Sequence, residues 1–180
     1  MKGIVFTEFL DLVEDKFGLE MVDTILSNSD LPSNGVYTAV GTYSFAEMVS
    51  LLTNLNKETG IAIDDLLLVY GEHFFSVVGR SYPEFLLQFT DPLQMLASIE
   101  NHIHVEVIKI YPDAELPTFE ILKHTGNELV MIYTSSRAMH SFGKGLMNKT
   151  FEHFNQKATI LVEKLNDQGT EVKFSITTNE

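Results

Sequence analysis

Apolar residues recur at helical spacing through the first 110 residues, and this pattern gives way to short β-prone runs after Pro112 and Pro117. The opening segment shows the helical pattern clearly, with apolar residues at Val5, Phe9, Leu12, Val13 and Phe17. Residues three and four apart share one face of a helix. The change of pattern predicts an α+β fold, in which a helical N-terminal lobe packs over a C-terminal lobe containing an antiparallel sheet and helices.

Turn residues set the expected boundaries of these elements. Asp91 before Pro92 favours a helix start, because aspartate caps helices and proline is tolerated at the first helical position. We expect a single helix from Pro92 to Ile110. The other predicted helices cover residues 2–17, 19–27, 44–60, 62–79 and 141–156, with a further start at Pro83, and strands are expected at 119–123, 129–133, 159–165 and 171–177.

Length and charge narrow the class of protein. The 180 residues fit one domain, 1–180, large enough to enclose a ligand between two halves. The formal charge of -13 disfavours nucleic acid and anionic membrane surfaces as partners. The chain has no cysteine and no apolar stretch long enough to cross a bilayer, so we expect a soluble, cytoplasmic protein. Common phosphate-loop, zinc-protease and serine-hydrolase motifs are missing, which gives no support for an enzyme of those classes.

Two of the six histidines lie close together on the predicted helix 92–110. At 100° per residue, His102 and His104 point about 200° apart. His104 falls within the apolar stripe of that helix, which runs through Leu93, Leu96, Ile103, Val107 and Tyr111. An inward histidine is most often a hydrogen-bonded core residue, but one helical imidazole facing an apolar cavity is also what haem requires. The pattern leaves both interpretations open.

A second group of polar residues follows the strand predicted at 129–133. Tyr133, Ser135 and Arg137 alternate, and they share one face if the strand continues through them. An arginine fork with two hydroxyl groups suits the propionates of a haem. A solvated strand edge has the same pattern, so this group alone does not decide between the two.

The spacing of these groups resembles the haem-nitric oxide/oxygen binding (H-NOX) family, which includes the haem domain of soluble guanylate cyclase and stand-alone bacterial relatives. His104 lies 29 residues before the Tyr-x-Ser-x-Arg sequence at 133–137, and Pro117 lies 13 residues after His104. The resemblance extends over nearly the whole chain. It also includes the opening Met-Lys-Gly, the Phe17-Gly18 helix end, the Ile110-Tyr111-Pro112 turn and the hairpin before Tyr133.

The resemblance implies a role for each of these residues. His104 would be the iron ligand of haem b (iron protoporphyrin IX), and Tyr133, Ser135 and Arg137 would hold the propionates. Pro117 would press on the macrocycle, although a rigid turn before the first strand also explains a proline there. The residues at the distal, gas-binding side would be Val5, Phe9, Phe74 and Phe142.

Some family members bind oxygen with the help of a distal tyrosine hydroxyl, but phenylalanine cannot donate a hydrogen bond. The resemblance therefore predicts a nitric oxide sensor that discriminates against oxygen, with carbon monoxide as a further ligand. Nitric oxide would weaken the bond from iron to His104, and the resulting change would regulate a separate histidine kinase or cyclic-di-GMP enzyme. Two rival interpretations remain, namely a haem oxidase or peroxidase and a haem-free module that binds lipid or acts as a scaffold.

Overall fold

Helices dominate the first two thirds of the chain in the computed structural model, which describes residues 1–178. A four-stranded sheet and one further helix follow. The helices are α1 (Gly3–Phe17), α2 (Leu19–Asn28), α3 (Phe45–Thr59), α4 (Ile63–Ser81), α5 (Pro83–Leu86), α6 (Pro92–Ala97), α7 (His104–Ile110) and α8 (His140–His153), with a π-helical turn, η1 (Ile99–Ile103), between α6 and α7. The strands are β1 (Thr118–His124), β2 (Glu128–Thr134), β3 (Ala158–Lys164) and β4 (Glu171–Thr178).

The predicted α+β arrangement is confirmed, and most boundaries agree within a few residues. Helix α6 begins as expected, with the Asp91 carboxylate accepting a hydrogen bond from the Gln94 N–H at 2.8 Å. The prediction of one helix from Pro92 to Ile110 was wrong, because the helix widens at η1. There the Ile103 N–H donates to the Ser98 carbonyl, five residues back. The rule of 100° per residue therefore does not apply between Ser98 and His104.

The sheet is antiparallel throughout and has the order β1-β2-β4-β3. Its two central strands bury alternate side chains on one face, where Met147 and Phe151 of α8 pack against them. These inward residues are Leu129, Met131 and Tyr133 on β2 and Val172, Phe174 and Ile176 on β4. Both predicted hairpins are present, but the pairing of β2 with β4 joins them into one sheet and fixes the position of Tyr133.

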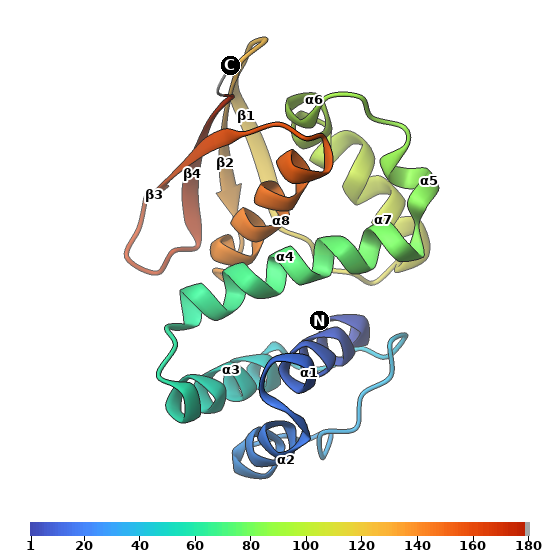
Figure 1. Ribbon diagram of the computed structural model, residues 1–180, viewed down its shortest axis with the longest axis vertical. Coiled ribbons are helices and arrows are strands. Elements are labelled where there is room, and N and C mark those ends of the chain that lie inside the picture. The colour runs from blue at the N-terminus through green and yellow to red at the C-terminus, as the bar shows by residue number, and fades with distance from the viewer. Residues whose placement is uncertain (179–180) are drawn as a thin grey trace.

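The molecule has two lobes joined by a long helix. Helices α1, α2 and α3 lie at one end, α4 crosses the middle, and the sheet lies at the other end with α8 beside it (Figure 1). Helix α4 packs most extensively against α8. Within residues 1–178, no helix combines the length and the apolar character that a bilayer crossing requires.

The first residues of the chain are held against the segment before α3. Lys2 and Thr42 form an antiparallel bridge, and the Gly3 N–H donates to the Gly41 carbonyl at 2.8 Å. A Cβ atom at Gly3 would lie 1.8 Å from the carbonyl oxygen of Thr38. Only glycine fits this close approach, which gives the Met-Lys-Gly opening a structural reason.

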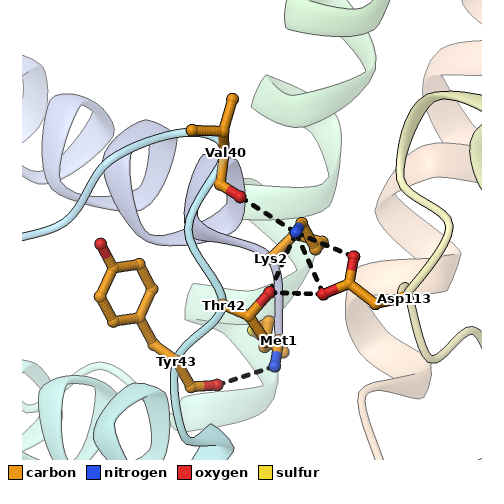
Figure 2. Close-up of polar contacts among 6 residues, drawn as sticks. All are labelled: Met1, Lys2, Val40, Thr42, Tyr43 and Asp113. Carbon is orange, nitrogen blue, oxygen red and sulfur yellow. Dashed lines mark hydrogen bonds and ion pairs between the residues drawn. The ribbon is translucent and has the colours of Figure 1, made fainter.

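Lys2 also joins this N-terminal bridge to the segment that follows α7. Its Nζ atom donates to the Val40 carbonyl, to Thr42 Oγ1 and to both carboxylate oxygens of Asp113. Thr42 Oγ1 donates to the same carboxylate at 2.8 Å (Figure 2). We call Lys2, Thr42 and Asp113 the interlobe cluster. It connects the N-terminal lobe to the chain just beyond the helix that carries His104.

The interlobe cluster should make stability depend on pH. Hydrogen bonds from Thr42 and Lys2 lower the pKa of the Asp113 carboxyl below its ordinary value. A carboxyl group of this kind stabilises the fold above its ordinary pKa, and the contribution is lost as the pH falls through the lowered pKa. We therefore expect Asp113→Asn to reduce the urea midpoint at neutral pH, with the difference from wild type disappearing in acid.

Asp11 of α1 provides a control with the same change of charge. It is exposed and lies outside the interlobe cluster. Asp11→Asn should leave the urea midpoint nearly unchanged at neutral pH. Equal effects of the two substitutions would show that net charge, and not the cluster, causes the loss.

Candidate functional site

His104 is the first residue of α7 and directly follows the π-helical turn. Turns of this kind are rare and often occur at functional sites, because they re-aim a side chain within a helix. The His104 side chain is only 16% exposed. Its Nδ1 atom lies 3.2 Å from Glu100 Oε1, and its ring centroid lies 6.0 Å from that of Phe119. Burial lowers the pKa of His104, with Glu100 opposing the shift, so the imidazole is neutral at physiological pH.

His102 has a different environment from His104. Its Nε2 atom lies 2.8 Å from Gln88 Oε1, and its ring stacks on Phe85 at a centroid distance of 6.2 Å. Phe89 contacts the same ring edge-on. His102 is thus held against the segment around α5, whereas His104 faces β1.

The ring of Phe119 lies between those of Tyr133 and His104 and contacts both. The Phe119 ring centroid lies 5.6 Å from that of Tyr133, which is buried in the sheet. The Tyr133 hydroxyl accepts a hydrogen bond from the Met139 N–H at 3.0 Å. Burial raises the pKa of Tyr133, so the hydroxyl keeps its proton and remains a donor for a second partner.

The strand does not continue through Ser135 and Arg137, so the condition under which Tyr133, Ser135 and Arg137 would share one strand face is not met. Strand β2 ends at Thr134, and the Arg137 N–H donates to Ser135 Oγ at 3.2 Å in the turn that follows. Serine and threonine hydroxyls often stabilise turns by bonding the backbone two residues on, which is why the alternation stops here. The three residues remain neighbours, but a turn and not a shared strand face holds them.

Glu115 is the present partner of the Arg137 guanidinium. Arg137 Nη1 donates to the Glu115 carbonyl at 2.7 Å, and Nη2 bonds the Glu115 carboxylate. The guanidinium also lies 5.8 Å from the centre of the Phe45 ring. The Arg137 side chain is only 16% exposed, whereas that of Glu115 is 82% exposed, so the carboxylate approaches the covered guanidinium from the solvent side. The arginine is therefore positioned to exchange this carboxylate for another one.

Pro117 lies between two fixed points of the chain. Glu115 is bound to Arg137 on one side, and the Phe119 N–H donates to Glu100 Oε1 at 2.9 Å on the other. Pro117 itself is partly buried. The five residues from Glu115 to Phe119 are thus held at both ends, by Arg137 at one end and by Glu100 at the other.

The four predicted distal residues gather in the core of the N-terminal lobe. Phe9 comes from α1, Phe74 from α4 and Phe142 from α8, and Val5 packs against the same cluster. The Phe74 and Phe142 ring centroids are 5.6 Å apart. The structure therefore brings together residues that are up to 137 positions apart in the sequence.

Tyr70 stands at the centre of these aromatic rings and was missed in the sequence analysis. Its ring centroid lies 5.4 Å from Phe9, 5.9 Å from Phe74 and 5.1 Å from Phe142. Its hydroxyl donates to the Val5 carbonyl at 2.5 Å, and burial raises its pKa well above the ordinary value. The helical spacing of Tyr70 and Phe74 was the available signal. The only hydroxyl among these rings is thus already bonded to the backbone.

The two groups of residues meet at Met139. Its N–H binds the Tyr133 hydroxyl, and its side chain packs with the cluster that contains Phe9 and Tyr70. Met139 therefore connects the end of the sheet that carries Tyr133 to this aromatic, donor-poor wall, and His104 and Arg137 supply an imidazole and a guanidinium to the same site. This donor set fits a flat apolar group that carries a metal and carboxylates, as haem does.

Comparisons with known proteins agree with this description. The chain matches the family described as Haem-NO-binding over residues 2–162. No functionally curated protein matches it. An Fe(II) unliganded H-NOX protein from K. algicida is 68% identical, with a TM-score of 0.98, over 100% of this chain and 97% of its own.

More distant solved structures have the same architecture. An H-NOX from Shewanella woodyi in the Fe(II)CO ligation state is 36% identical, with a TM-score of 0.84, over 99% of this chain and 95% of its own. An H-NOX protein from S. oneidensis in the Fe(II)NO ligation state is 24% identical, with a TM-score of 0.91 and complete coverage of both chains. At this identity the S. oneidensis structure supports the fold alone.

Proposed function

The chain belongs to the H-NOX family of haem-based gas sensors, and from this premise we propose that it is a nitric oxide sensor that binds haem b through His104. H-NOX domains are sensor domains and not catalysts. The observation that carries the proposal is the His104 imidazole, which is only 16% exposed and has its Nδ1 atom 3.2 Å from Glu100 Oε1, so that Nε2 is left for iron.

The other predicted residues would bind the remainder of the haem. Arg137 would exchange Glu115 for a propionate, with the Tyr133 and Ser135 hydroxyls as additional donors. Pro117 would contact the macrocycle from the segment held between Glu115 and Phe119. The haem supplies a ferrous iron that binds a diatomic gas.

The distal wall supports selectivity for nitric oxide. Phe9, Phe74 and Phe142 have no hydrogen-bond donor, and the Tyr70 hydroxyl is bonded to the Val5 carbonyl. Oxygen gains much from a distal donor because it draws electron density from ferrous iron, whereas nitric oxide and carbon monoxide need little such help. These residues therefore favour nitric oxide over oxygen.

Helix α7 is suited to transmit the signal. His104 is its first residue, and Val105 and Ile108 of the same helix are 45% and 39% exposed. Loss of the bond between His104 and iron would remove one constraint on α7 and would let its exposed face shift. A separate cytoplasmic histidine kinase or cyclic-di-GMP enzyme would read this change, with residues 1–180 acting as one sensor domain.

We expect ferrous protein to keep its absorption spectrum in air and to change it on addition of nitric oxide. The reason is the lack of a free distal donor among Phe9, Phe74 and Phe142. The measurement is the Soret band of the haem-loaded protein under each gas. A stable spectrum of an oxygenated protein would refute the selectivity, and a colourless protein after haem supplementation would refute the haem site itself.

Two tyrosine variants sharpen this test. Phe142→Tyr adds a hydroxyl to the wall and should allow an oxygenated spectrum. Tyr70→Phe removes the hydroxyl bonded to Val5 and should leave the response to air unchanged. If Tyr70→Phe instead altered the response to oxygen, the Tyr70 hydroxyl would be available to the gas.

A further inference from the structure

Glu100 is the residue that connects His104 to the sheet. It lies in the π-helical turn, four residues before His104, and its side chain is 37% exposed. Its Oε1 atom lies 3.2 Å from His104 Nδ1 and also accepts the Phe119 N–H at 2.9 Å. One carboxylate oxygen of Glu100 thus contacts both His104 of α7 and Phe119 of β1, which are 15 positions apart in the sequence.

The chemistry of this contact decides the protonation of the ring. An ionised carboxylate can only accept hydrogen bonds, so Nδ1 must carry a proton to bond to it. A neutral imidazole has one ring proton, and with that proton on Nδ1 the lone pair is on Nε2. The contact with Glu100 therefore selects the tautomer in which Nε2 is available to a metal.

We propose that Glu100 is a positioning residue that sets the strength with which His104 binds iron. The inference rests on the proposed role of His104 as the iron ligand. A carboxylate bonded to the second nitrogen of a metal-binding histidine fixes the orientation of the ring and raises its basicity. Glu100 and His104 are four residues apart at the junction of η1 and α7, a spacing at which two side chains of a helix are neighbours.

The shared oxygen gives Glu100 a second effect. The Phe119 N–H bonds the same carboxylate, so the orientation of the imidazole is fixed relative to β1 as well as relative to its own helix. Release of His104 from iron would then leave the ring tethered to the sheet. The ease of that release, and so the response to nitric oxide, depends on Glu100.

The test compares ferrous haem-loaded Glu100→Gln and Glu100→Ala with Glu106→Gln. Glu106 is a matched control, because it lies two residues from His104 on α7 but pairs with Lys109. The readouts are the iron–histidine stretching frequency by resonance Raman spectroscopy and the rate of haem transfer to an acceptor protein. We expect both Glu100 variants to lower the frequency and Glu100→Ala to release haem about 10–100-fold faster. Glu106→Gln should match wild type in both.

The outcomes separate this inference from the proposed function. Equal frequencies in Glu100→Gln, Glu106→Gln and wild type would overturn the role of Glu100 while leaving His104 as the ligand. Failure of the wild-type protein to bind haem would instead refute the proposed function. In that case, nitrogen-15 shifts of the His104 ring in the full chain would still test the tautomer. A proton on Nε2 in the wild type, or on Nδ1 in Glu100→Ala, would count against the contact with Glu100.

Discussion

Replacing His104 with glycine should weaken haem retention by more than about 100-fold, since loss of a group that merely supports a metal ligand already costs about 10–100-fold. The substitution removes the only side chain that we assign to the iron. It leaves a space the size of an imidazole beside Glu100 and Phe119. Added imidazole should occupy this space and restore the ferrous absorption spectrum, but it is not connected to α7.

His102→Gly is the control for this experiment. Its ring bonds Gln88 and stacks on Phe85, so its loss should leave haem retention unchanged with or without imidazole. The measurements are haem content after purification and the Soret band during imidazole titration. If His102→Gly were the variant that lost haem and was rescued by imidazole, His104 would not be the ligand.

The second large effect is expected at Gly145, where α8 crosses α4. A Cβ atom there would lie 2.2 Å from the Leu68 carbonyl oxygen, 2.9 Å from the Glu72 nitrogen and 3.0 Å from the Gly71 Cα atom. All three are backbone atoms, so no side chain can move aside. Overpacking of this kind costs about 1–3 kcal/mol, and we expect Gly145→Ala to lower the free energy of unfolding by at least this amount.

Gly143 gives a control of opposite sign on the same helix. A Cβ atom there meets nothing within 4 Å, so Gly143→Ala should stabilise α8 by up to about 1 kcal/mol through helix propensity alone. Urea unfolding of both variants measures the difference. Equal stabilities of the two variants would show that α4 and α8 do not pack as closely as described.

The periodicity of apolar residues predicted most of the helices and all four strands, because these elements bury one face. The break at η1 could not be predicted, since a π-helical turn keeps the same apolar residues and changes only their angle. Ser98 marks the break, but serine is common in continuous helices. The pairing of β2 with β4 was also missed, because alternation within a strand does not specify its neighbour.

The candidate site was predicted in part from residue spacing and in part from family resemblance. The rings of His104 and Tyr133 both lie beside that of Phe119, and Pro117 precedes Phe119 by two residues. Glu100, Glu115 and Tyr70 were not predicted. Glu100 contacts His104 one helical turn away, but its contact with Phe119 depends on tertiary packing, as do the contacts of Glu115 and Tyr70. Glutamate at a surface position gives no signal of its partner.

The chain between α7 and β1, residues 111–117, has no regular secondary structure and connects a helix to a strand, as surface loops do. Asp113 is tied to Lys2, Glu115 to Arg137 and Phe119 to Glu100. Most connections accept added or removed residues, but this one is anchored at two points, Asp113 and Glu115, and the start of β1 is anchored at Phe119, so a change in length would move one of these contacts. Relatives should therefore differ in length at the hairpin turn 125–127 and not here, and a tag or reporter domain inserted for gas detection belongs at that turn.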